Sequence, residues 1–321
     1  MSITVGIIGA GAMGTAVAQT VAPNANVLLY ARREEICNDI NRNNVNSQYF
    51  PNVKLHDNIV AVCDLNELKD VEIVFLCIPS SVMRELVEKL NKIVNNDCIF
   101  VSTAKGIENK SNKTMTDIIE DITKRPAVAF SGPNIASEMV KNLSASTTIA
   151  CTAKNSLNKV KNVLVTDSFK VNANTDVVGT EFCGIIKNIV AISQGICEGM
   201  AINNNAKFAV FTKSYNETKD IIEKLGGKRD TVDDYCGFGD IVTASTLTVS
   251  RNHTLGVLSG QGIVIDEKAS GVLFEGKNTA IILKSLCDKL NINSLTVNFV
   301  YDVIINRSNP KNAFYKLWGQ L

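Results

Sequence analysis

Histidine is almost absent from this chain of 321 residues, in which only His56 and His253 occur. A metal site built from several histidines is therefore excluded, we expect no metal, and histidine acid–base chemistry has few candidates. The chain also lacks an excess of either charge, because 33 Lys and Arg residues and 32 Asp and Glu residues leave a net charge of +1. Such a chain has no overall field for nucleic acid or acidic membranes, so we expect neither as a partner.

Closely spaced cysteines are missing as well. The 9 cysteines are dispersed without a CxxC pair, and several lie in apolar runs such as the one around Cys77, which is typical of reduced core thiols in a cytosolic protein. Residues 3–22 are mostly apolar, but their glycines and the following Pro23 argue against a membrane-spanning helix. Because no charged residue precedes Arg32, a signal peptide is not expected either. We therefore expect a cytoplasmic protein without membrane insertion.

Hydrophobic periodicity divides the chain into two parts. Up to about residue 176, short apolar strands alternate with amphipathic helices, which predicts βαβ units and a mostly parallel sheet. The expected strands are 3–9, 26–31, 71–78, 98–102, 127–130, 147–151 and 169–173, and the expected helices between them include 12–22, one from 33, and 80–94. Later segments show helical periodicity, in 179–200, 203–225, 239–249, 275–290 and 295–305. We predict an α/β Rossmann domain over residues 1–175 and an all-α domain over residues 176–321.

A GxGxxG motif follows the first expected strand and opens the first expected helix, as Gly9-Ala-Gly11-Ala-Met-Gly14. Gly9 permits the tight turn, Gly11 lets the backbone approach a pyrophosphate, and Gly14 lets the helix pack closely against the strand. The amino end of the helix attracts the anion. This motif predicts a dinucleotide-binding site in the first domain.

The end of the second expected strand distinguishes the two nicotinamide cofactors. NAD enzymes usually place an acidic residue there to bind the ribose hydroxyls, whereas this strand continues into Ala31-Arg32-Arg33. Two guanidinium groups suit a 2′-phosphate by charge and by their forked donors, so NADPH is favoured over NADH. The alternative is a solvated pair at the start of a helix that also contains Glu34 and Glu35.

Four further segments of the chain carry candidate functional groups. Lys187 has small or apolar neighbours three and four positions away, so it is either a partly desolvated proton-transfer group or a lysine that extends to the surface. Asp240 either orients a catalytic cation or caps a helix. Arg251 and Asn252 either bind a phosphate group or are an exposed polar pair without a ligand. Residues 131–134 place Pro133 at an expected first helical position, where an anion could bind.

Taken together, these segments resemble the NAD(P)-dependent glycerol-3-phosphate dehydrogenases over nearly the whole chain. The most specific motifs are STAKGIE at 102–108, SGPNIASE at 131–138 and SRN at 250–252, together with the lysine-containing helix. The matching segments are 6–18, 46–55, 75–80, 102–108, 131–138, 179–199, 204–207, 236–240, 250–252 and 274–280. The resemblance implies reversible reduction of dihydroxyacetone phosphate to sn-glycerol 3-phosphate with NADPH or NADH. The product supplies the backbone of glycerophospholipids.

The resemblance also implies roles for individual residues. Lys187 is the proton donor and acceptor, Asp240 supports it, and Lys105 contacts both cofactor and substrate. The candidate cofactor contacts are Gly9, Gly11, Ala12, Met13, Gly14, Arg32, Arg33, Lys105, Ala136, Arg251, Leu273 and Glu275. The candidate substrate contacts are Lys105, Gly132, Asn134, Lys187, Asp240, Ser250, Arg251 and Asn252. By analogy we expect a homodimer formed through the helical domain.

Two positions depart from the family pattern, and two other functions compete with it. Met13 stands where an aromatic residue or Asn is expected, and Ala244 stands where Thr is common, with Thr243 beside it. One competing function is that of another Rossmann-plus-helical reductase, of the hydroxyacid or ketopantoate type. The other is that of a non-catalytic NADP-binding redox sensor, which would not need both Lys187 and Asp240.

Overall fold

The computed structural model describes residues 3–109, 111–247, 250–265 and 274–321. It divides into two compact units, one of residues 1–108 with 113–177 and one of residues 109–112 with 178–321. The first unit is an α/β domain with a mostly parallel sheet, and helices are the regular elements among the described residues of the second. The predicted fold class is therefore confirmed.

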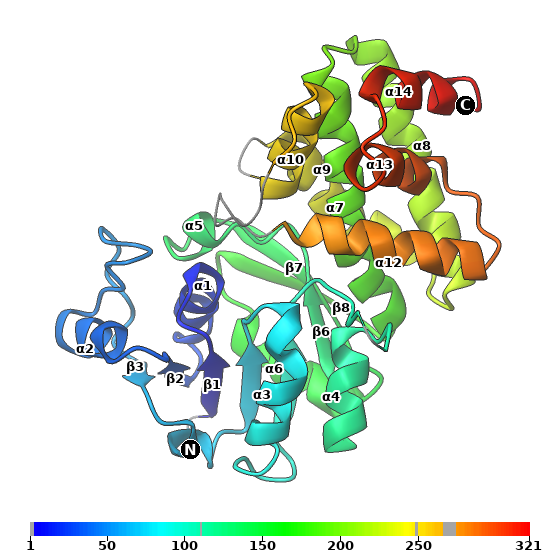
Figure 1. The fold of residues 1–321 in the computed structure, drawn as a ribbon. Coiled ribbons are helices and arrows are strands. Elements are labelled where there is room, and N and C mark those ends of the chain that lie inside the picture. Colours follow the sequence, from blue (N-terminus) through cyan, green and yellow to red (C-terminus); the bar gives the residue numbers. More distant parts are fainter. Residues whose placement is uncertain (1–2, 110, 248–249, 266–273) are drawn as a thin grey trace. The chain divides into compact units, whose positions relative to one another are not determined.

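The first unit is built on an eight-stranded sheet in the order β3-β2-β1-β4-β5-β6-β7-β8 (Figure 1). The strands are β1 (Thr4–Ile8), β2 (Asn26–Tyr30), β3 (Ile59–Val62), β4 (Ile73–Leu76), β5 (Ile99–Ser102), β6 (Val128–Ser131), β7 (Ala145–Ala150) and β8 (Phe169–Asn174). Neighbouring strands are parallel except for the pair β6 and β7. From β1 the chain runs outward to β2 and β3, and it then returns to the other side of β1 as β4. A crevice opens at the carboxyl ends of the strands at such a reversal, and dinucleotides bind there in sheets of this kind.

Helices cover both faces of this sheet. They are α1 (Ala12–Val21), α2 (Glu34–Asn43), α3 (Met83–Leu90), α4 (Met115–Thr123), α5 (Ala136–Met139) and α6 (Lys154–Leu164), with short 3₁₀ turns η1 (Leu65–Leu68) and η2 (Ser80–Val82). Apolar side chains of α1, α2, α5 and α6 share one buried cluster with one face of the sheet, and those of α3 and α4 share a second cluster with the other face. The helices α2, α3, α4 and α6 therefore each bury one apolar side, whereas α1 is buried on every side from Gly14 to Val21.

Two expectations about this unit are wrong. Pro133 does not open a helix, because α5 begins at Ala136 with Ile135 as its N-cap. The cysteines are not all reduced, because Cys37 and Cys63 form a disulfide that joins α2 to the end of β3. Their separation of 26 positions in sequence conceals this proximity, since the parallel pairing of β2 and β3 returns the chain to the same end of the sheet. The other 7 cysteines, all among the described residues, form no disulfide.

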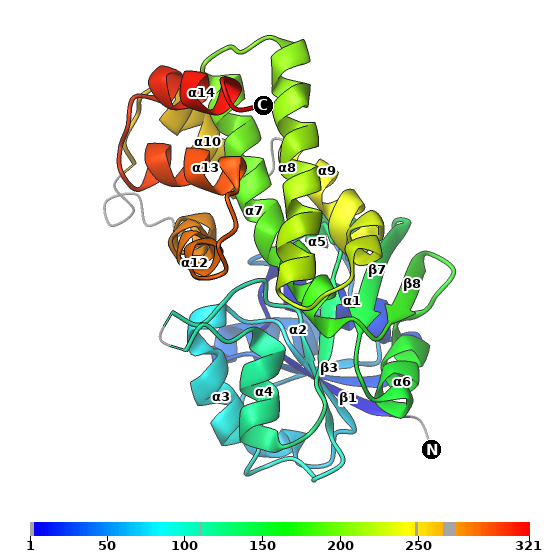
Figure 2. The same cartoon turned by 90° about the vertical axis from the view of Figure 1, so that its right-hand side faces the viewer.

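The second unit consists of packed helices. They are α7 (Val177–Gly199), α8 (Asn204–Lys224), η3 (Arg229–Asp233), the π-helical turn η4 (Tyr235–Gly239), α9 (Asp240–Thr246), α10 (Arg251–Gly260), α12 (Glu275–Lys289), α13 (Leu295–Ile304) and α14 (Pro310–Trp318). Figure 2 shows α13 between α12 and α14, and its residues contact both helices. No helix among the described residues is both long enough and apolar enough to cross a membrane.

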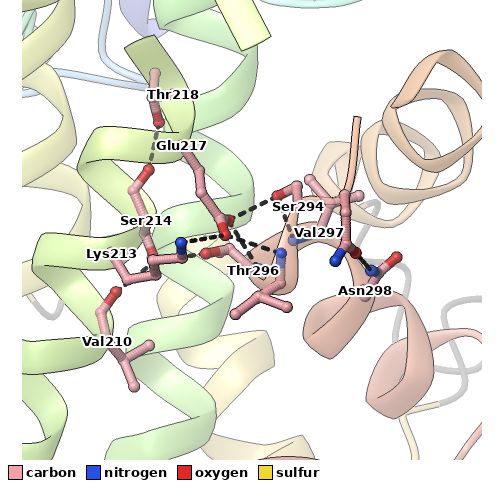
Figure 3. Close-up of polar contacts among 11 residues, drawn as sticks. Val210, Lys213, Ser214, Glu217, Thr218, Ser294, Thr296, Val297 and Asn298 are labelled. Carbon is pink, nitrogen blue, oxygen red and sulfur yellow. Dashed lines mark hydrogen bonds and ion pairs between the residues drawn. The ribbon is translucent and has the colours of Figure 1, made fainter. Parts of the chain in front are cut away.

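A buried carboxylate joins α8 to the start of α13 (Figure 3). Glu217 is only 5% exposed. It accepts hydrogen bonds from the Ser294 hydroxyl at 2.7 Å and from the backbone N–H groups of Leu295 at 2.9 Å and Thr296 at 3.0 Å. The amino end of a helix has unpaired N–H groups and a partial positive charge. This carboxylate accepts hydrogen bonds from such N–H groups and its negative charge balances the partial positive charge. Glu217 is thus a capping group supplied by another helix.

Candidate active site

The glycine motif lies at the crevice beside β1. Gly9 has φ +104°, and a Cβ there would lie 2.7 Å from the carbonyl oxygen of Cys77. A Cβ on Gly14 would lie 1.8 Å from the carbonyl oxygen of Gly9, so the helix packs against the turn at backbone distance. A Cβ on Gly11, by contrast, would meet only the Tyr49 hydroxyl at 4.0 Å. Gly11 therefore leaves open the space that a pyrophosphate needs, as the motif predicts.

The first turn of α1 completes the anion site. Gly11 is its N-cap, Ala12 and Met13 are its first helical residues, and the turn carries no acidic side chain. Its backbone N–H groups and helix dipole are therefore available to a phosphate. Desolvation raises the pKa of the neighbouring Cys77 thiol to about 12, so this sulfur stays neutral and does not repel an anion.

A cavity of about 550 Å³ extends from the glycine motif to the end of β2. Its lining includes Gly9, Gly11, Ala31, Arg32 and Arg33. Arg33 is the N-cap residue of α2, and its guanidinium donates a hydrogen bond to the Gln48 side chain. The two arginines therefore line the same cavity as the glycines, and the position after β2 is occupied by Ala31 rather than an acidic residue.

The AKG and SGPN motifs meet in the first unit. The ammonium of Lys105 donates a hydrogen bond to the carbonyl oxygen of Gly132 at 3.0 Å. Asn134 is held by its own amide, which donates to the Ser146 carbonyl at 3.2 Å, and by the Thr147 hydroxyl, which donates to its Oδ1 at 3.2 Å. Ala136 follows as the first residue of α5. The structure thus brings Lys105, Gly132 and Asn134 together.

Lys187 and Asp240 form an ion pair in the second unit, with 2.6 Å between Nζ and Oδ1. The side chains are 15% and 3% exposed, so the lysine does not extend to the surface. Asp240 is the first residue of α9, which follows the π-helical turn η4, and it is not the N-cap. The Coulomb attraction between charges at this distance is strong when little water screens them. The geometry therefore favours a buried, paired Lys187 over a surface lysine, and an Asp240 that orients a cation over a helix cap.

The π-helical turn aims Asp240. A Cβ on Gly237 would lie 2.1 Å from the Val232 carbonyl oxygen, so only glycine fits at this point of the turn. The Thr243 hydroxyl donates to the Gly239 carbonyl at 2.7 Å, which ties α9 back to the turn. Ala244, which replaces the threonine common in the family, is buried at 7% exposure. Short π-helical segments occur frequently at functional sites, and the sequence pattern did not reveal this one.

The SRN cluster stands at the amino end of α10. Ser250 is the N-cap and accepts a hydrogen bond from the His253 backbone at 3.3 Å, while Arg251 is exposed. The Oδ1 of Asn252 accepts from the Gly276 N–H at 3.2 Å at the start of α12. This bond directs the carbonyl oxygen of Asn252 toward α12 and leaves its NH₂ group as the donor for an anion.

Two predicted contacts lie wholly or partly beyond the described residues. Leu273 lies outside them. Glu275 is placed as the first residue of α12, without a described side chain.

Two other groups of residues near these motifs escaped the sequence analysis. One is the ion pair between Arg84 and Glu108 close to Lys105. The other is a set of glycines where α7 and α10 cross, which comprises Gly195, Gly199, Gly256 and Gly260. Both depend on contacts between segments far apart in the sequence, although the GxxxG spacing in each helix was a visible signal.

Comparison with known proteins gives a consistent result. The protein-family model for the NAD-dependent glycerol-3-phosphate dehydrogenase N-terminus matches residues 4–157, and the family model for the C-terminus matches residues 176–315. A glycerol-3-phosphate dehydrogenase [NAD(P)+] from Clostridium botulinum (strain Eklund 17B / Type B) is 32% identical over 317 residues, 98% of this chain and 96% of that protein. Another from Halothermothrix orenii is 33% identical over 323 residues, 99% of this chain and 95% of that protein.

Solved structures agree. The crystal structure of glycerol-3-phosphate dehydrogenase from Coxiella burnetii has a TM-score of 0.89 at 27% identity and covers 98% of both chains. A ketopantoate reductase from Ralstonia eutropha JMP134 has a TM-score of 0.61 at 14% identity over 98% of this chain and 100% of its own, a likeness of fold alone. The resemblance noted in the sequence is confirmed, and the chain belongs to the NAD-dependent glycerol-3-phosphate dehydrogenase family.

Proposed function

We propose that this chain interconverts dihydroxyacetone phosphate and sn-glycerol 3-phosphate with NADPH, or with NADH, and supplies glycerophospholipid synthesis. The observation that carries the proposal is the buried ion pair between Lys187 and Asp240. A sensor that only binds NADP has no need of such a pair, because burying two charges is costly unless each is well paired. The first unit then serves as the dinucleotide-binding domain, and the second as the substrate and catalytic domain.

Lys187 is the proposed proton donor for reduction. The reduced nicotinamide supplies a hydride to the ketone carbon when it is bound. Negative charge then grows on the ketone oxygen, and the ammonium of Lys187 both stabilises that charge and delivers the proton. Asp240 holds Nζ in place through the 2.6 Å contact and balances the charge before the proton leaves. In the oxidation direction the neutral amine accepts the proton from the alcohol.

The substrate phosphate needs cations of its own. Arg251 offers a guanidinium fork at the amino end of α10, and Asn252 adds its NH₂ group. Lys105 adds an ammonium beside the Gly132 and Asn134 backbone, where both cofactor and substrate are proposed to bind. Ser250 joins the same substrate set. Ala136, Leu273 and Glu275 complete the proposed cofactor contacts.

Substitution at the ion pair tests this function. Lys187→Ala should abolish reduction of dihydroxyacetone phosphate, and Asp240→Asn should lower kcat by about 10²-fold, a typical loss for one preorganised group. NADPH titration should show nearly unchanged binding in both variants. Lys219→Ala is the matched control, because it removes a lysine at 2.7 Å from Asp233 in the same unit. Undiminished turnover in Lys187→Ala refutes the assigned role.

A substrate survey separates this function from its competitor. The wild-type enzyme should reduce dihydroxyacetone phosphate with either cofactor offered and should leave 2-keto acids and ketopantoate unreduced. Reduction of a keto acid without reduction of dihydroxyacetone phosphate contradicts the proposal.

Cofactor preference is proposed to rest on Arg32 and Arg33. Each charge-assisted hydrogen bond to a 2′-phosphate is worth about 1.5–3 kcal/mol, so removal of one guanidinium should raise the KM for NADPH by roughly tenfold or more. The KM for NADH should change little, because NADH lacks that phosphate. Equal effects on both cofactors in Arg32→Ala and Arg33→Ala refute the preference for NADPH.

We also infer a homodimer that acts in the cytoplasm. Aromatic side chains of the helical unit support the dimer, since Phe208 and Phe238 are 54% and 51% exposed and Phe238 packs edge-to-face on Tyr215 of α8. Light scattering of the purified protein tests the oligomer, and a monomer at assay concentration contradicts it. Cell fractionation tests the location.

A further inference from the structure

A forked ion pair lies close to Lys105 and plays no part in the function described above. The Nε of Arg84 on α3 donates to Oε1 of Glu108 at 2.9 Å, and its Nη2 donates to Oε2 at 2.8 Å. The side chains are 38% and 23% exposed. Two parallel bonds between planar groups fix orientation as well as distance, which a single lysine–carboxylate bond does not.

This pair closes one end of the segment that carries Lys105. At the other end, the Thr103 hydroxyl donates to the Leu76 carbonyl at 3.0 Å. Between them, Gly106 lies so close to η2 that a Cβ would be 2.7 Å from the Ser80 side chain. The segment 103–108 is therefore held to β4, η2 and α3 in turn, and Lys105 is placed between these contacts.

The charge of Glu108 gives the pair a second role. Its carboxylate stands only three residues after Lys105, so the two opposite charges are joined by a short stretch of backbone. Arg84 donates one hydrogen bond to each oxygen of the Glu108 carboxylate and so directs this carboxylate toward α3. Without Arg84, this carboxylate loses its forked partner and attracts the ammonium of Lys105, which lies on the same short segment. The ammonium would then leave Gly132, to which it donates at 3.0 Å.

We propose that Arg84 and Glu108 are positioning residues that keep the ammonium of Lys105 at the Gly132 carbonyl, available to the substrate. They act through Lys105 and touch neither substrate nor cofactor. The inference rests on the role proposed for Lys105, and it adds two residues on which binding of dihydroxyacetone phosphate depends.

Steady-state kinetics of the full-length enzyme test the proposal. Arg84→Gln should raise the KM for dihydroxyacetone phosphate by about tenfold, while the KM for NADPH changes less than about twofold, because a displaced ammonium loses its substrate contact. The double variant Arg84→Gln/Glu108→Gln should recover most of the lost affinity, because the competing carboxylate is gone and two amides can still pair. Arg84→Lys, which keeps the charge but not the fork, should fall between wild type and Arg84→Gln.

Arg229→Gln is the matched control. It removes an arginine that bonds Asp220 at 2.7 Å and Glu223 at 2.9 Å on the helical unit, and it should leave both KM values unchanged. Thermal unfolding of every variant separates a loss of fold from a loss of position. If Arg84→Gln does not fold, Arg84→Lys carries the test and should raise the same KM while leaving the KM for NADPH unchanged.

Two results overturn the proposal. One is a KM for dihydroxyacetone phosphate in Arg84→Gln, or in Arg84→Lys where that variant carries the test, that matches the control. The other is a double variant no better than Arg84→Gln, which would reduce the pair to a support of the fold. Wild-type enzyme without activity on dihydroxyacetone phosphate would overturn the proposed function together with this inference, whereas active wild type with unaffected variants overturns this inference alone.

Discussion

Replacement of Gly256 by alanine should damage both stability and activity. Gly256 lies on α10 where this helix crosses α7, and a Cβ there would lie 2.3 Å from the Ile192 carbonyl oxygen and 2.9 Å from the Gly195 backbone. The contact is reciprocal, because a Cβ on Gly195 would lie 2.2 Å from the His253 carbonyl oxygen. The two helices therefore touch backbone to backbone, and neither flexible side chains nor water can make room.

The size of the effect follows from these distances. A Cβ is essentially never found within 3.0 Å of a non-bonded heavy atom, so the helices must separate by about 1 Å at the crossing. Overpacking of this kind costs about 1–3 kcal/mol of unfolding free energy. Arg251 opens α10 and Lys187 lies on α7, so the same shift moves the proposed phosphate anchor away from the proton donor. A misplacement of about 1 Å can lower the rate by about 10²-fold.

Urea unfolding and kcat/KM for dihydroxyacetone phosphate measure the two effects separately. The control is Gly319→Ala at the C-cap of α14, where a Cβ would lie 3.4 Å from the Tyr315 carbonyl oxygen, an ordinary contact. This variant should retain wild-type stability and activity. Wild-type values of both quantities in Gly256→Ala would refute the reasoning, and loss of stability with full kcat/KM would show that the crossing does not position Arg251.

Two further perturbations test features of single units. Reduction of the Cys37–Cys63 disulfide, or its removal by Cys37→Ser with Cys63→Ser, should lower the unfolding free energy by about 3.5 kcal/mol, the loop-entropy value for a separation of 26 residues. Urea unfolding with and without a thiol reductant measures this loss, and equal unfolding midpoints contradict the prediction. Burial lowers the pKa of His253 in the folded protein below its ordinary 6.5, so its neutral form favours folding above pH 6.5 and this stability is lost as the pH falls toward the folded pKa. Between pH 7.5 and 5.5, the unfolding free energy should therefore fall less in His253→Gln than in wild type, and an equal fall in the two proteins refutes the assignment.

Local patterns predicted most of the elements that position the cofactor site. The apolar runs gave the central strands, and the glycine motif lies at the end of β1 as its spacing required. The pattern missed β3, an edge strand of four residues whose Val60 is 48% exposed, because so short a run has no periodicity to measure. It also missed α4 and α14, although both carried visible start signals. Thr114 and Asp117 form a capping box, and Asn309 caps a helix with proline at its start.

The family motifs identified Lys187 and Asp240 as the proposed catalytic residues, but they did not predict that the two side chains form an ion pair. Lys187 and Asp240 are 53 positions apart, and periodicity alone left each with a bland alternative of surface lysine or helix cap. The alternatives are decided by which side chain faces which, a property of how α7 and α9 pack. The π-helical turn before Asp240 sets the direction of this side chain, and the hydrophobic period of 3.6 residues that indicates an α-helix does not predict such a turn.

The positions that the sequence analysis missed share one physical feature, namely that each is defined by its partner. Arg84 looks like an ordinary solvated residue of an amphipathic helix until Glu108 is placed 2.8 Å away. Cys37 looks like a reduced core cysteine until the return of the chain through β3 brings Cys63 to it. A glycine motif can be recognised alone, because it binds through its own backbone. Residues that act by holding another residue acquire their meaning only in the fold, so a search for further determinants of activity in this family should begin from pairs rather than from motifs.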